Sequence, residues 1–293
     1  MNIKDLADYH HPVSKLFAEV KEQVDYEPFA LSKEQVEHFD EYGYVTNVKI
    51  LEEDQVDVLR KALDEIQDPE HPARDLFYEF HGNHSTNPDT VLFHSLGHWR
   101  VSEAFHDALW NPAFTKPASQ LLGNKAVRFW HDQLFCKPAG HGGVVAWHQD
   151  YSYWIRTVPM QHLTCWIGLD DASTENGCLN YVPSSHRWGL LKRLELGGEM
   201  DALFEQLDEA LQAQIKPVPM ELKKGHACFH HPLMVHGSYE NKSQRSRRAM
   251  VLNVFADGTK SDTDDIMLRG TDIRVPKGKA LDTKYFPLIY PAN

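Results

Sequence analysis

Apolar residues recur at helical spacing in the first part of the chain. Residues 32–43 begin with a Ser-x-x-Gln pattern that is typical of a capped helix, and they end at a glycine. An apolar face with a period near 3.6 also runs through three later segments, which we predict to be helices: 53–66, 102–110 and 112–122. Residues 1–125 should therefore form a mainly helical N-terminal part.

Two other segments of this N-terminal part lack the helical pattern. Residues 44–48 (YVTNV) are rich in β-branched and aromatic side chains, which predicts a strand. Residues 68–95 are rich in Pro, His, Asn and Gly and show no sustained period. Long loops of this kind are uncommon unless they have a function, so we expect 68–95 to be irregular and to lie on the surface or beside a substrate.

The pattern changes at residue 126 to short β-rich runs separated by turn residues. Glu175-Asn176-Gly177 is the clearest of these turns. Seven or eight such strands in succession predict a jelly roll over residues 126–256. The predicted strands are 127–137, 144–149, 162–169, 178–182, 227–230, 234–237 and 248–255.

One long interval between two of these strands has a pattern of its own. Residues 199–215 repeat leucine or isoleucine every four residues, which predicts a helical insertion. We expect this helix to cover the sheet, and a part in a lid over a binding site is the alternative. Residues 257–293 should be an irregular tail fixed by Tyr285, Phe286 and Tyr290. The expected fold class is mainly β with helical additions (α+β).

Composition and charge narrow the classes of function. The formal net charge of −12 and the absence of a long basic run argue against a nucleic-acid partner. Neither a secretory signal nor an apolar stretch of about 18 residues is present, so we expect neither export nor a membrane span. Four scattered cysteines fit a reducing, cytoplasmic location. We expect a small-molecule substrate, and the sequence indicates no oligomeric state.

Three residues have the chemistry and the spacing of a metal site. In an extended strand, residues i and i+2 point to the same side, so His148 and Asp150 can converge on one ion. His236 follows an apolar run and precedes a glycine, as at a strand end, and it is the best candidate for a third ligand. Two neutral imidazoles and one carboxylate form the donor set of iron(II) sites that activate oxygen. Because the three must meet across the sequence, we favour a single domain over residues 1–293.

Arg247 adds a recognition group for an acidic cosubstrate. It follows His236 at a distance that allows the chain to cross a hairpin and return beside the metal on a neighbouring strand. A guanidinium there would bind a carboxylate through two parallel N–H groups, which a lysine cannot reproduce.

Other histidines serve as a control and as a competing site. A second His-x-Asp pattern, His38 and Asp40, lies in the predicted helix 32–43, where positions i and i+2 are about 200° apart and should not share a metal. His226, Cys228 and His230 would line one face of a strand, and thiolate with imidazole suits zinc. No Cys-x-x-Cys pair is present, so we favour a core strand in which Cys228 is a small buried hydrophobe.

Several spaced motifs resemble the phytanoyl-CoA dioxygenase family of Fe(II)/2-oxoglutarate oxygenases. They are Lys137–Asp150, Trp166–Pro183 and Phe229–Ala249, and the similarity also reaches Leu31–Val48, so that it covers about residues 31–256. The family often has Pro-Gly-Ser-His where this chain has Pro183-Ser184-Ser185-His186. That departure should alter a turn and leave the chemistry intact, because no expected ligand lies there.

The resemblance implies a fold, cofactors and a reaction. The jelly roll should be a cupin-like double-stranded β-helix, and the enzyme should be an oxidoreductase that uses Fe(II), 2-oxoglutarate and O2. Hydroxylation of an unactivated C–H bond in a small metabolite, with release of succinate and CO2, is the expected outcome. The implied metal ligands are His148, Asp150 and His236, with no other catalytic group. The residues expected to bind 2-oxoglutarate are Arg247, Ser238, Lys137 and Trp166.

The substrate itself is not indicated by the sequence. Residues near the metal motif that can supply contacts are Gln133, Tyr151, Tyr153, Trp154 and Arg156. Desaturation, ring formation and demethylation need the same oxidant and stay open as outcomes. Two other classes also stay open: a non-catalytic jelly roll that binds metal or 2-oxoglutarate as a sensor, and a metal-dependent hydrolase with the same ligands.

Overall fold

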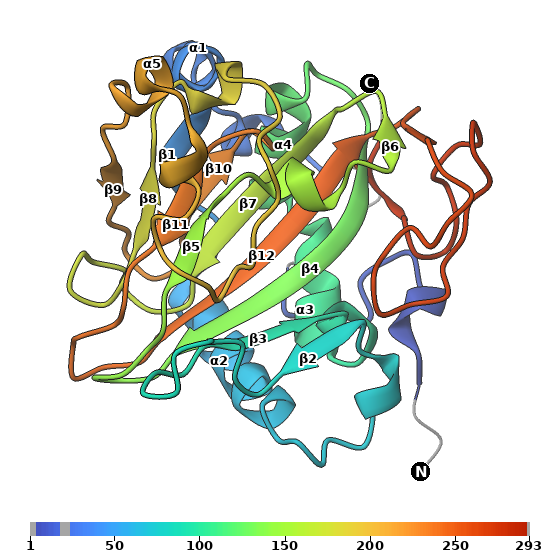
Figure 1. The fold of residues 1–293 in the computed structure, drawn as a ribbon. Coiled ribbons are helices and arrows are strands. Elements are labelled where there is room, and N and C mark those ends of the chain that lie inside the picture. The colour runs from blue at the N-terminus through green and yellow to red at the C-terminus, as the bar shows by residue number, and fades with distance from the viewer. Residues whose placement is uncertain (1–3, 18–23, 292–293) are drawn as a thin grey trace.

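Two antiparallel sheets form the centre of the computed structural model, which describes residues 4–17 and 24–291 (Figure 1). The larger sheet contains β1 (Tyr44–Lys49), β2 (Glu79–His81), β3 (Phe93–Leu96), β4 (Val127–Lys137), β7 (His162–Gly168), β10 (His226–His230), β12 (Arg247–Ala256) and β14 (Leu288–Tyr290). Its order is β1-β10-β7-β12-β4-β3-β2, and β14 also pairs with β4.

The smaller sheet packs on one side of the larger one and completes the predicted jelly roll. It contains β5 (Val145–His148), β8 (Leu179–Tyr181), β9 (Val218–Met220) and β11 (His236–Ser238), in the order β5-β11-β8-β9. A separate short pair joins β6 (Thr157–Val158) to β13 (Lys260–Ser261). The fold is therefore mainly β with helical additions, as the strand pattern predicts.

The strands of the large sheet are hydrophobic on both faces because both faces are covered. Along β12, Met250 and Leu252 belong to the cluster shared with the helices, whereas Ala249 and Val251 belong to the cluster between the two sheets. This alternation is the period of two that an extended chain imposes. A strand covered on both sides reads as a continuous apolar run, which is why β12 was recognisable from the sequence.

The helices form one layer on the face of the large sheet that lies away from the small sheet (Figure 1). They are α2 (Glu53–Ile66), α3 (Glu103–Asp107) and α4 (Pro112–Leu121), while α1 (Lys33–Tyr42) precedes β1 at the sheet edge. Ser32 and Gln35 form the predicted capping box of α1, and Gly43 ends it with φ 83°. The helix predictions in the N-terminal part are thus confirmed.

One prediction about a connecting segment is wrong, and a second is wrong in part. Residues 199–215 form no continuous helix, because Asp208 caps a new start and leaves only α5 (Glu209–Gln212) after an isolated 3-10 turn. The segment 68–95 is not wholly irregular, since it contains β2 and β3. Strand β3 pairs with β4 and β2 pairs with β3, so these short strands extend the large sheet through contacts made far away in sequence.

The C-terminal segment returns to the large sheet. In the predicted tail, β14 pairs with β4, and Phe286 and Tyr290 are buried as expected, with Tyr285 partly buried. Residues 1–3 and 18–23 of the N-terminal part and 292–293 of the tail lie outside the described residues. No helix in the part of the chain that the structure describes is long and apolar enough to cross a membrane.

Ser184 shows where the chain departs from the resembling family. Its φ is 65°, in the left-handed region where a glycine carries no steric cost. Its hydroxyl donates to the carbonyl of Glu41 at 3.1 Å, which offsets part of the strain of about 1 kcal/mol. The departure lies at the start of the 3-10 turn Ser185–Arg187, where Ser184 adopts the left-handed backbone that a glycine favours, and an altered turn stays a prediction.

Candidate metal and cosubstrate site

Two short strands of the small sheet bring the predicted metal ligands together. His148 ends β5, His236 begins β11, and the two residues face each other in the antiparallel register. Asp150 follows β5 at the start of a 3-10 turn, after an extended Gln149 with φ −116° and ψ 131°. The extended Gln149 keeps His148 and Asp150 on the same side, as the i, i+2 spacing predicts.

The ligand atoms of these three residues all lie within 4.8 Å of one another. One oxygen of Asp150, Oδ1, lies 3.4 Å from Nε2 of His148 and 3.7 Å from Nε2 of His236. The Nδ1 atom of His148 is 2.8 Å from the Ala146 carbonyl, and that of His236 is 2.9 Å from the Met234 carbonyl. Each Nδ1–H therefore donates to the carbonyl two residues before it, which leaves both Nε2 lone pairs directed towards Oδ1. This donor set fits iron(II).

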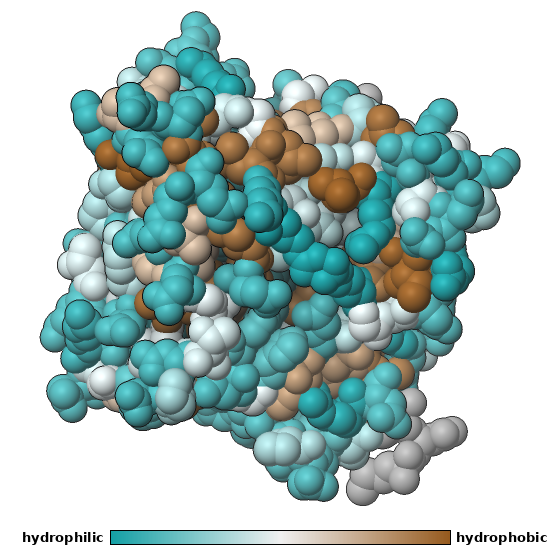
Figure 2. Space-filling model, in the orientation of Figure 1, coloured by the Kyte–Doolittle hydropathy of each residue, from teal (hydrophilic) through white to brown (hydrophobic). Residues whose placement is uncertain are grey.

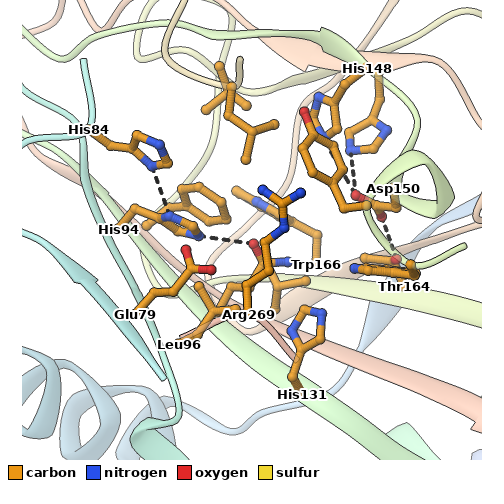
Figure 3. Close-up of a pocket in the computed structure, with 18 of the residues that line it drawn as sticks. Glu79, His84, His94, Leu96, His131, His148, Asp150, Thr164, Trp166 and Arg269 are labelled. Atoms are coloured by element: carbon orange, nitrogen blue, oxygen red, sulfur yellow. Dashed lines mark hydrogen bonds and ion pairs between the residues drawn. The ribbon is translucent and has the colours of Figure 1, made fainter. Parts of the chain in front are cut away.

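The second oxygen of Asp150 is held by residues of the large sheet (Figure 3). Thr164 donates to Oδ2 at 2.6 Å, and Nε2 of His230 lies 2.9 Å from the same atom. The Tyr181 hydroxyl is 2.8 Å from Nδ1 of His230 and holds that ring against Asp150. These contacts occupy Oδ2 and leave Oδ1 for the metal.

Electrostatics also favours a charged Asp150. Burial opposes its ionisation, but His236, His148 and His230 outweigh burial and hold the carboxyl pKa well below its usual range. For His236, burial and the neighbouring His148 and His230 lower the pKa well below its usual value. A carboxylate beside the neutral imidazole of His236 is a protonation state that favours metal binding.

Arg247 is buried beside this site without a polar partner. Its side chain is 1% exposed, and Nε makes no hydrogen bond within the described residues. Its guanidinium carbon lies 5.4 Å from the Trp166 ring, and burial lowers the arginine pKa to about 10. A buried cation without a counter-ion is costly, so the site fits an anion such as the far carboxylate of 2-oxoglutarate.

Lys137 acts behind Ser238 and does not reach the cavity. It is fully buried, and its ammonium donates to the hydroxyl of Ser238 at 2.7 Å and to two carbonyls, those of Ser238 and Tyr239. Burial and the charge of Arg247 lower the pKa of Lys137 well below its usual value. Because the lysine donates to Ser238 Oγ, the Ser238 hydroxyl proton is free to point at a cosubstrate.

These residues surround a cavity of about 240 Å³ that opens as a hollow on the face shown in Figure 2. Of the residues expected to bind metal, cosubstrate or substrate, all but Lys137 and Tyr151 line it. Those that do are Gln133, His148, Asp150, Tyr153, Trp154, Arg156, Trp166, His236, Ser238 and Arg247.

Tyr151 and Tyr153 point to different places although they share one turn. The Tyr151 hydroxyl donates to the Thr157 carbonyl at 2.7 Å, and its ring packs near His162 in an apolar cluster outside the cavity lining. The Tyr153 ring lies 5.9 Å from that of His148 and faces the cavity. Tyr151 therefore has a structural role in packing. Of the two tyrosines, only Tyr153 is placed to contact a substrate.

Several residues of the cavity were not singled out by the sequence. Thr164 and His230 hold Asp150, although His230 was considered only for zinc. For Thr164, position within a strand was the only available signal, whereas His230 lies in the motif Phe229–Ala249, in which only other positions were assigned to the site. The other unexpected lining residues with polar chemistry are Glu79, His81, His84, His94, His131, Arg193, Glu195 and Arg269.

Three of these, His81, His84 and His94, also bring their nitrogens within 4.8 Å of one another. The rings of His81 and His84 are stacked, with centroids 4.2 Å apart and planes at 21°. Lone pairs in stacked rings run side by side and do not converge on one ion. His94 is also occupied, since its Nε2 is 3.0 Å from Gln133 Oε1 and its Nδ1 is 3.0 Å from Nδ1 of His84. We therefore assign no metal to this group.

The remaining histidine predictions are resolved by the fold. His38 and Asp40 lie on α1, where they form no metal group with a third ligand among the described residues. Cys228 is fully buried, and its Sγ lies 3.2 Å from the Thr46 hydroxyl. The core-strand interpretation of β10 is confirmed, and His226, Cys228 and His230 form no candidate metal group in the described part of the chain.

Known proteins are similar to this chain in sequence and in fold. A family model described as phytanoyl-CoA dioxygenase (PhyH) matches residues 39–249. A phytanoyl-CoA dioxygenase of Arabidopsis thaliana is 28% identical over 271 residues, which span 82% of this chain and 94% of that protein. A methylphosphonate hydroxylase of Gimesia maris is 30% identical over 240 residues, spanning 78% of this chain and 83% of that protein.

Solved structures with the same fold include two enzymes at low sequence identity. The non-heme α-ketoglutarate-dependent carbocyclase SnoK has a TM-score of 0.71 at 22% identity, over 92% of this chain and all (100%) of that chain. EctD from S. alaskensis has a TM-score of 0.66 at 21% identity, over 92% of this chain and 91% of that chain. Because the family model spans most of the sequence, the chain belongs to the phytanoyl-CoA dioxygenase family, and it is a dioxygenase that depends on Fe(II), 2-oxoglutarate and O2.

Proposed function

We propose that this dioxygenase hydroxylates an unactivated C–H bond of a small metabolite, with release of succinate and CO2. The observation that carries the proposal is the meeting of His148, Asp150 and His236 in one cavity with the buried, unpaired guanidinium of Arg247. When bound, Fe(II) and 2-oxoglutarate together supply the oxidising chemistry that such a hydroxylation needs.

Each residue of the site has a role in this proposal. Nε2 of His148, Nε2 of His236 and Oδ1 of Asp150 hold the metal, and Thr164 and His230 orient the carboxylate from behind. Arg247 and the Ser238 hydroxyl bind the far carboxylate of 2-oxoglutarate, with Trp166 beside the guanidinium. Lys137 does not contact 2-oxoglutarate itself. It fixes the Ser238 hydroxyl that does.

The cavity supports a small substrate. Its volume of about 240 Å³ lies below the usual range of ligand pockets, about 300–1,000 Å³, and it must also hold 2-oxoglutarate. Gln133, Tyr153, Trp154 and Arg156 are the proposed substrate contacts. A relative named a methylphosphonate hydroxylase also supports hydroxylation of a small compound. Ring formation, desaturation or demethylation would use the same residues with a different placement of the substrate.

One domain is proposed to carry the activity. Strands from the N-terminal part, β1, β2 and β3, belong to the same large sheet as β12, which carries Arg247. The C-terminal strand β14 pairs with β4 in that sheet as well. Cutting the chain between these parts would expose sheet edges and apolar surface, which supports treating residues 1–293 as one unit.

The first test is an anaerobic titration of metal-free protein with Fe(II) and then 2-oxoglutarate, followed by the visible charge-transfer band. We expect a band in the wild type. In Arg247→Lys, the 2-oxoglutarate concentration that gives half of the maximal band intensity should rise about tenfold or more. The reason is that an ammonium cannot donate two parallel hydrogen bonds. The matched control is Arg245→Lys, an exposed arginine two positions away in the same segment.

The outcomes separate the candidate functions. An unchanged 2-oxoglutarate dependence in Arg247→Lys would remove Arg247 from the cosubstrate site. A wild type that binds iron but gives no band would contradict the proposal and favour a metal-dependent hydrolase, which uses the same three ligands and has no need of Arg247. A band with 2-oxoglutarate turnover but no oxidised product from any compound would favour the sensor.

A further inference from the structure

Three arginines that the cosubstrate site does not use meet at the opening of the cavity. Arg156 follows the turn after β5, Arg193 lies in the segment between β8 and β9, and Arg269 lies in the C-terminal segment. All three line the cavity, and Figure 3 shows the guanidinium of Arg269 directed into it. Arg193 and Arg269 are exposed and Arg156 is half-buried, so the three mark the mouth and not the floor.

No carboxylate within the described residues forms an ion pair with any of these three arginines. Elsewhere among the described residues, four arginines are paired with an aspartate. The arginines paired in this way are Arg60 and Arg248 with Asp170, Arg100 with Asp5, and Arg128 with Asp257. The mouth of the cavity is therefore a concentration of free guanidinium groups in a protein whose net charge is −12.

Arg156 is close enough to Arg193 and Arg269 to be repelled by their charges. Burial lowers the pKa of Arg156, and the charges of Arg269 and then Arg193 lower it further, against a smaller opposing effect of Asp265. Arg193 lies over the Tyr153 ring at 4.7 Å, a contact with the face of the ring that leaves N–H donors available. An anion bound among the three would relieve this repulsion.

The carboxylates of the cavity are placed beside histidines. Glu79 Oε2 is 3.4 Å from Nε2 of His81, and Glu195 raises the pKa of His84 against the stronger effects of burial and His81. His94, whose pKa burial and His84 hold well below the usual value, is neutral and does not attract an anion. The cavity thus has three arginines at its mouth, with Glu79 beside His81 and with Glu195 near both His84 and Tyr153.

We propose that the substrate carries an oxyanion, a phosphonate, phosphate monoester or carboxylate, that Arg156, Arg193 and Arg269 bind at the mouth of the cavity. This inference rests on the proposed function, because it assigns Arg247 to 2-oxoglutarate and Asp150 to the metal and leaves these three arginines for the substrate. Guanidinium groups match the oxygens of such anions through paired N–H donors. The cavity volume of about 240 Å³ restricts the substrate to a small organic acid.

The test measures binding to wild-type protein loaded with Fe(II) and 2-oxoglutarate under nitrogen. The probes are propylphosphonate, butyrate and the uncharged butyramide. Calorimetry measures the dissociation constant of each. We expect at least one anion to bind, to bind about tenfold or more tightly than butyramide, and to weaken as ionic strength rises. Tighter binding of propylphosphonate indicates a phosphonate or phosphate substrate, and tighter binding of butyrate indicates a carboxylate.

Variants locate the bound anion. Arg156→Gln and Arg269→Gln should each weaken the better anion about tenfold, while butyramide binding stays unchanged. Arg274→Gln is the matched control, because Arg274 is exposed, lies in the same C-terminal segment as Arg269 and does not line the cavity. The charge-transfer band with 2-oxoglutarate, recorded for every variant, shows that the fold and the cosubstrate site are intact.

The possible results are distinguishable. Equal binding of anions and butyramide, unchanged anion binding in both cavity variants, or no anion binding beside an intact band would overturn the inference and leave the proposed function standing. Absence of the band in the wild type, which is read before any probe is added, would overturn the proposed function and this inference with it.

Discussion

Hydrogen bonds hold one carboxylate oxygen of Asp150 and leave the other free. Thr164 and His230 contact Oδ2, and His230 is itself fixed by the Tyr181 hydroxyl. Such contacts orient a metal-binding carboxylate and keep it ionised, and losing one typically weakens metal binding by about 10–100-fold. At the scale of single residues, metal affinity should therefore depend on Thr164, which touches no metal.

We expect Thr164→Val to weaken Fe(II) binding about tenfold, because valine keeps the shape of threonine and removes the 2.6 Å hydrogen bond to Asp150. The measurement is an anaerobic Fe(II) titration of the metal-free protein. Thr157→Val is the control, since Thr157 is equally buried but bonds to Tyr151 and His162 outside the cavity lining. Equal iron affinity in Thr164→Val and wild type would show that the hydrogen bond to Oδ2 does not tune the site.

At the scale of elements, the site depends on how closely β5 and β11 approach. The two strands are short, and each contributes one histidine of the proposed metal site, at the pair His148 and His236. Gly237 permits the approach, because a Cβ there would lie 2.9 Å from the Val145 carbonyl oxygen and 3.0 Å from Cε of Met200. Its φ does not lie in the left-handed region, so the need for glycine is one of space.

Gly237→Ala should push β11 away from β5. The added methyl group should cost about 1–3 kcal/mol in the free energy of unfolding of the metal-free protein, as overpacking usually does. Iron affinity should also fall, because His236 moves relative to His148. Urea unfolding and Fe(II) titration measure the two effects. In the control Gly82→Ala, a Cβ meets no atom within 4 Å, and neither quantity should change. A Gly237→Ala protein with wild-type stability would show that β5 and β11 can move apart without a loss in the free energy of unfolding.

At the scale of the whole molecule, several histidines are buried or partly buried in a neutral state. Burial lowers the pKa of His131 to about 4, that of His162 to about 3 and that of His231 to about 4. In the unfolded chain, each would titrate near its ordinary value of about 6.5. Below that pH, the unfolded state therefore binds more protons than the folded state.

Acidification should destabilise the metal-free protein before most carboxylates titrate. Stability should be constant above about pH 6.5 and should then fall towards pH 5, with each such histidine contributing about 1.4 kcal/mol per pH unit. Urea unfolding at a series of pH values, in the presence of a chelator, measures this slope. His162→Gln should reduce it, because glutamine does not titrate. A slope near zero between pH 6.5 and pH 5 would mean that these histidines are protonated in the folded protein.

Much of the fold followed from local patterns. The run 127–137 predicted β4 to the residue, and the apolar face of 53–66 predicted α2 to the residue. The burial of these elements repeats within one turn or one pleat, so a short stretch of sequence contains the signal. The fourfold spacing in 199–215 predicted one long helix, which is wrong because Asp208 caps a new helix start. A cap depends on a single residue, so the periodicity of the apolar residues does not reveal it.

The sequence by itself determined the chemistry that local motifs carry: His148 and Asp150 two apart, His236 at a strand end, and Arg247 after it. Only the tertiary structure decided which other groups join them. The pairing of β3 with β4, the contact of His230 with Asp150 and the meeting of Arg156, Arg193 and Arg269 all link residues distant in sequence. Such contacts depend on how sheets and loops pack in three dimensions, and no periodicity along the chain encodes them.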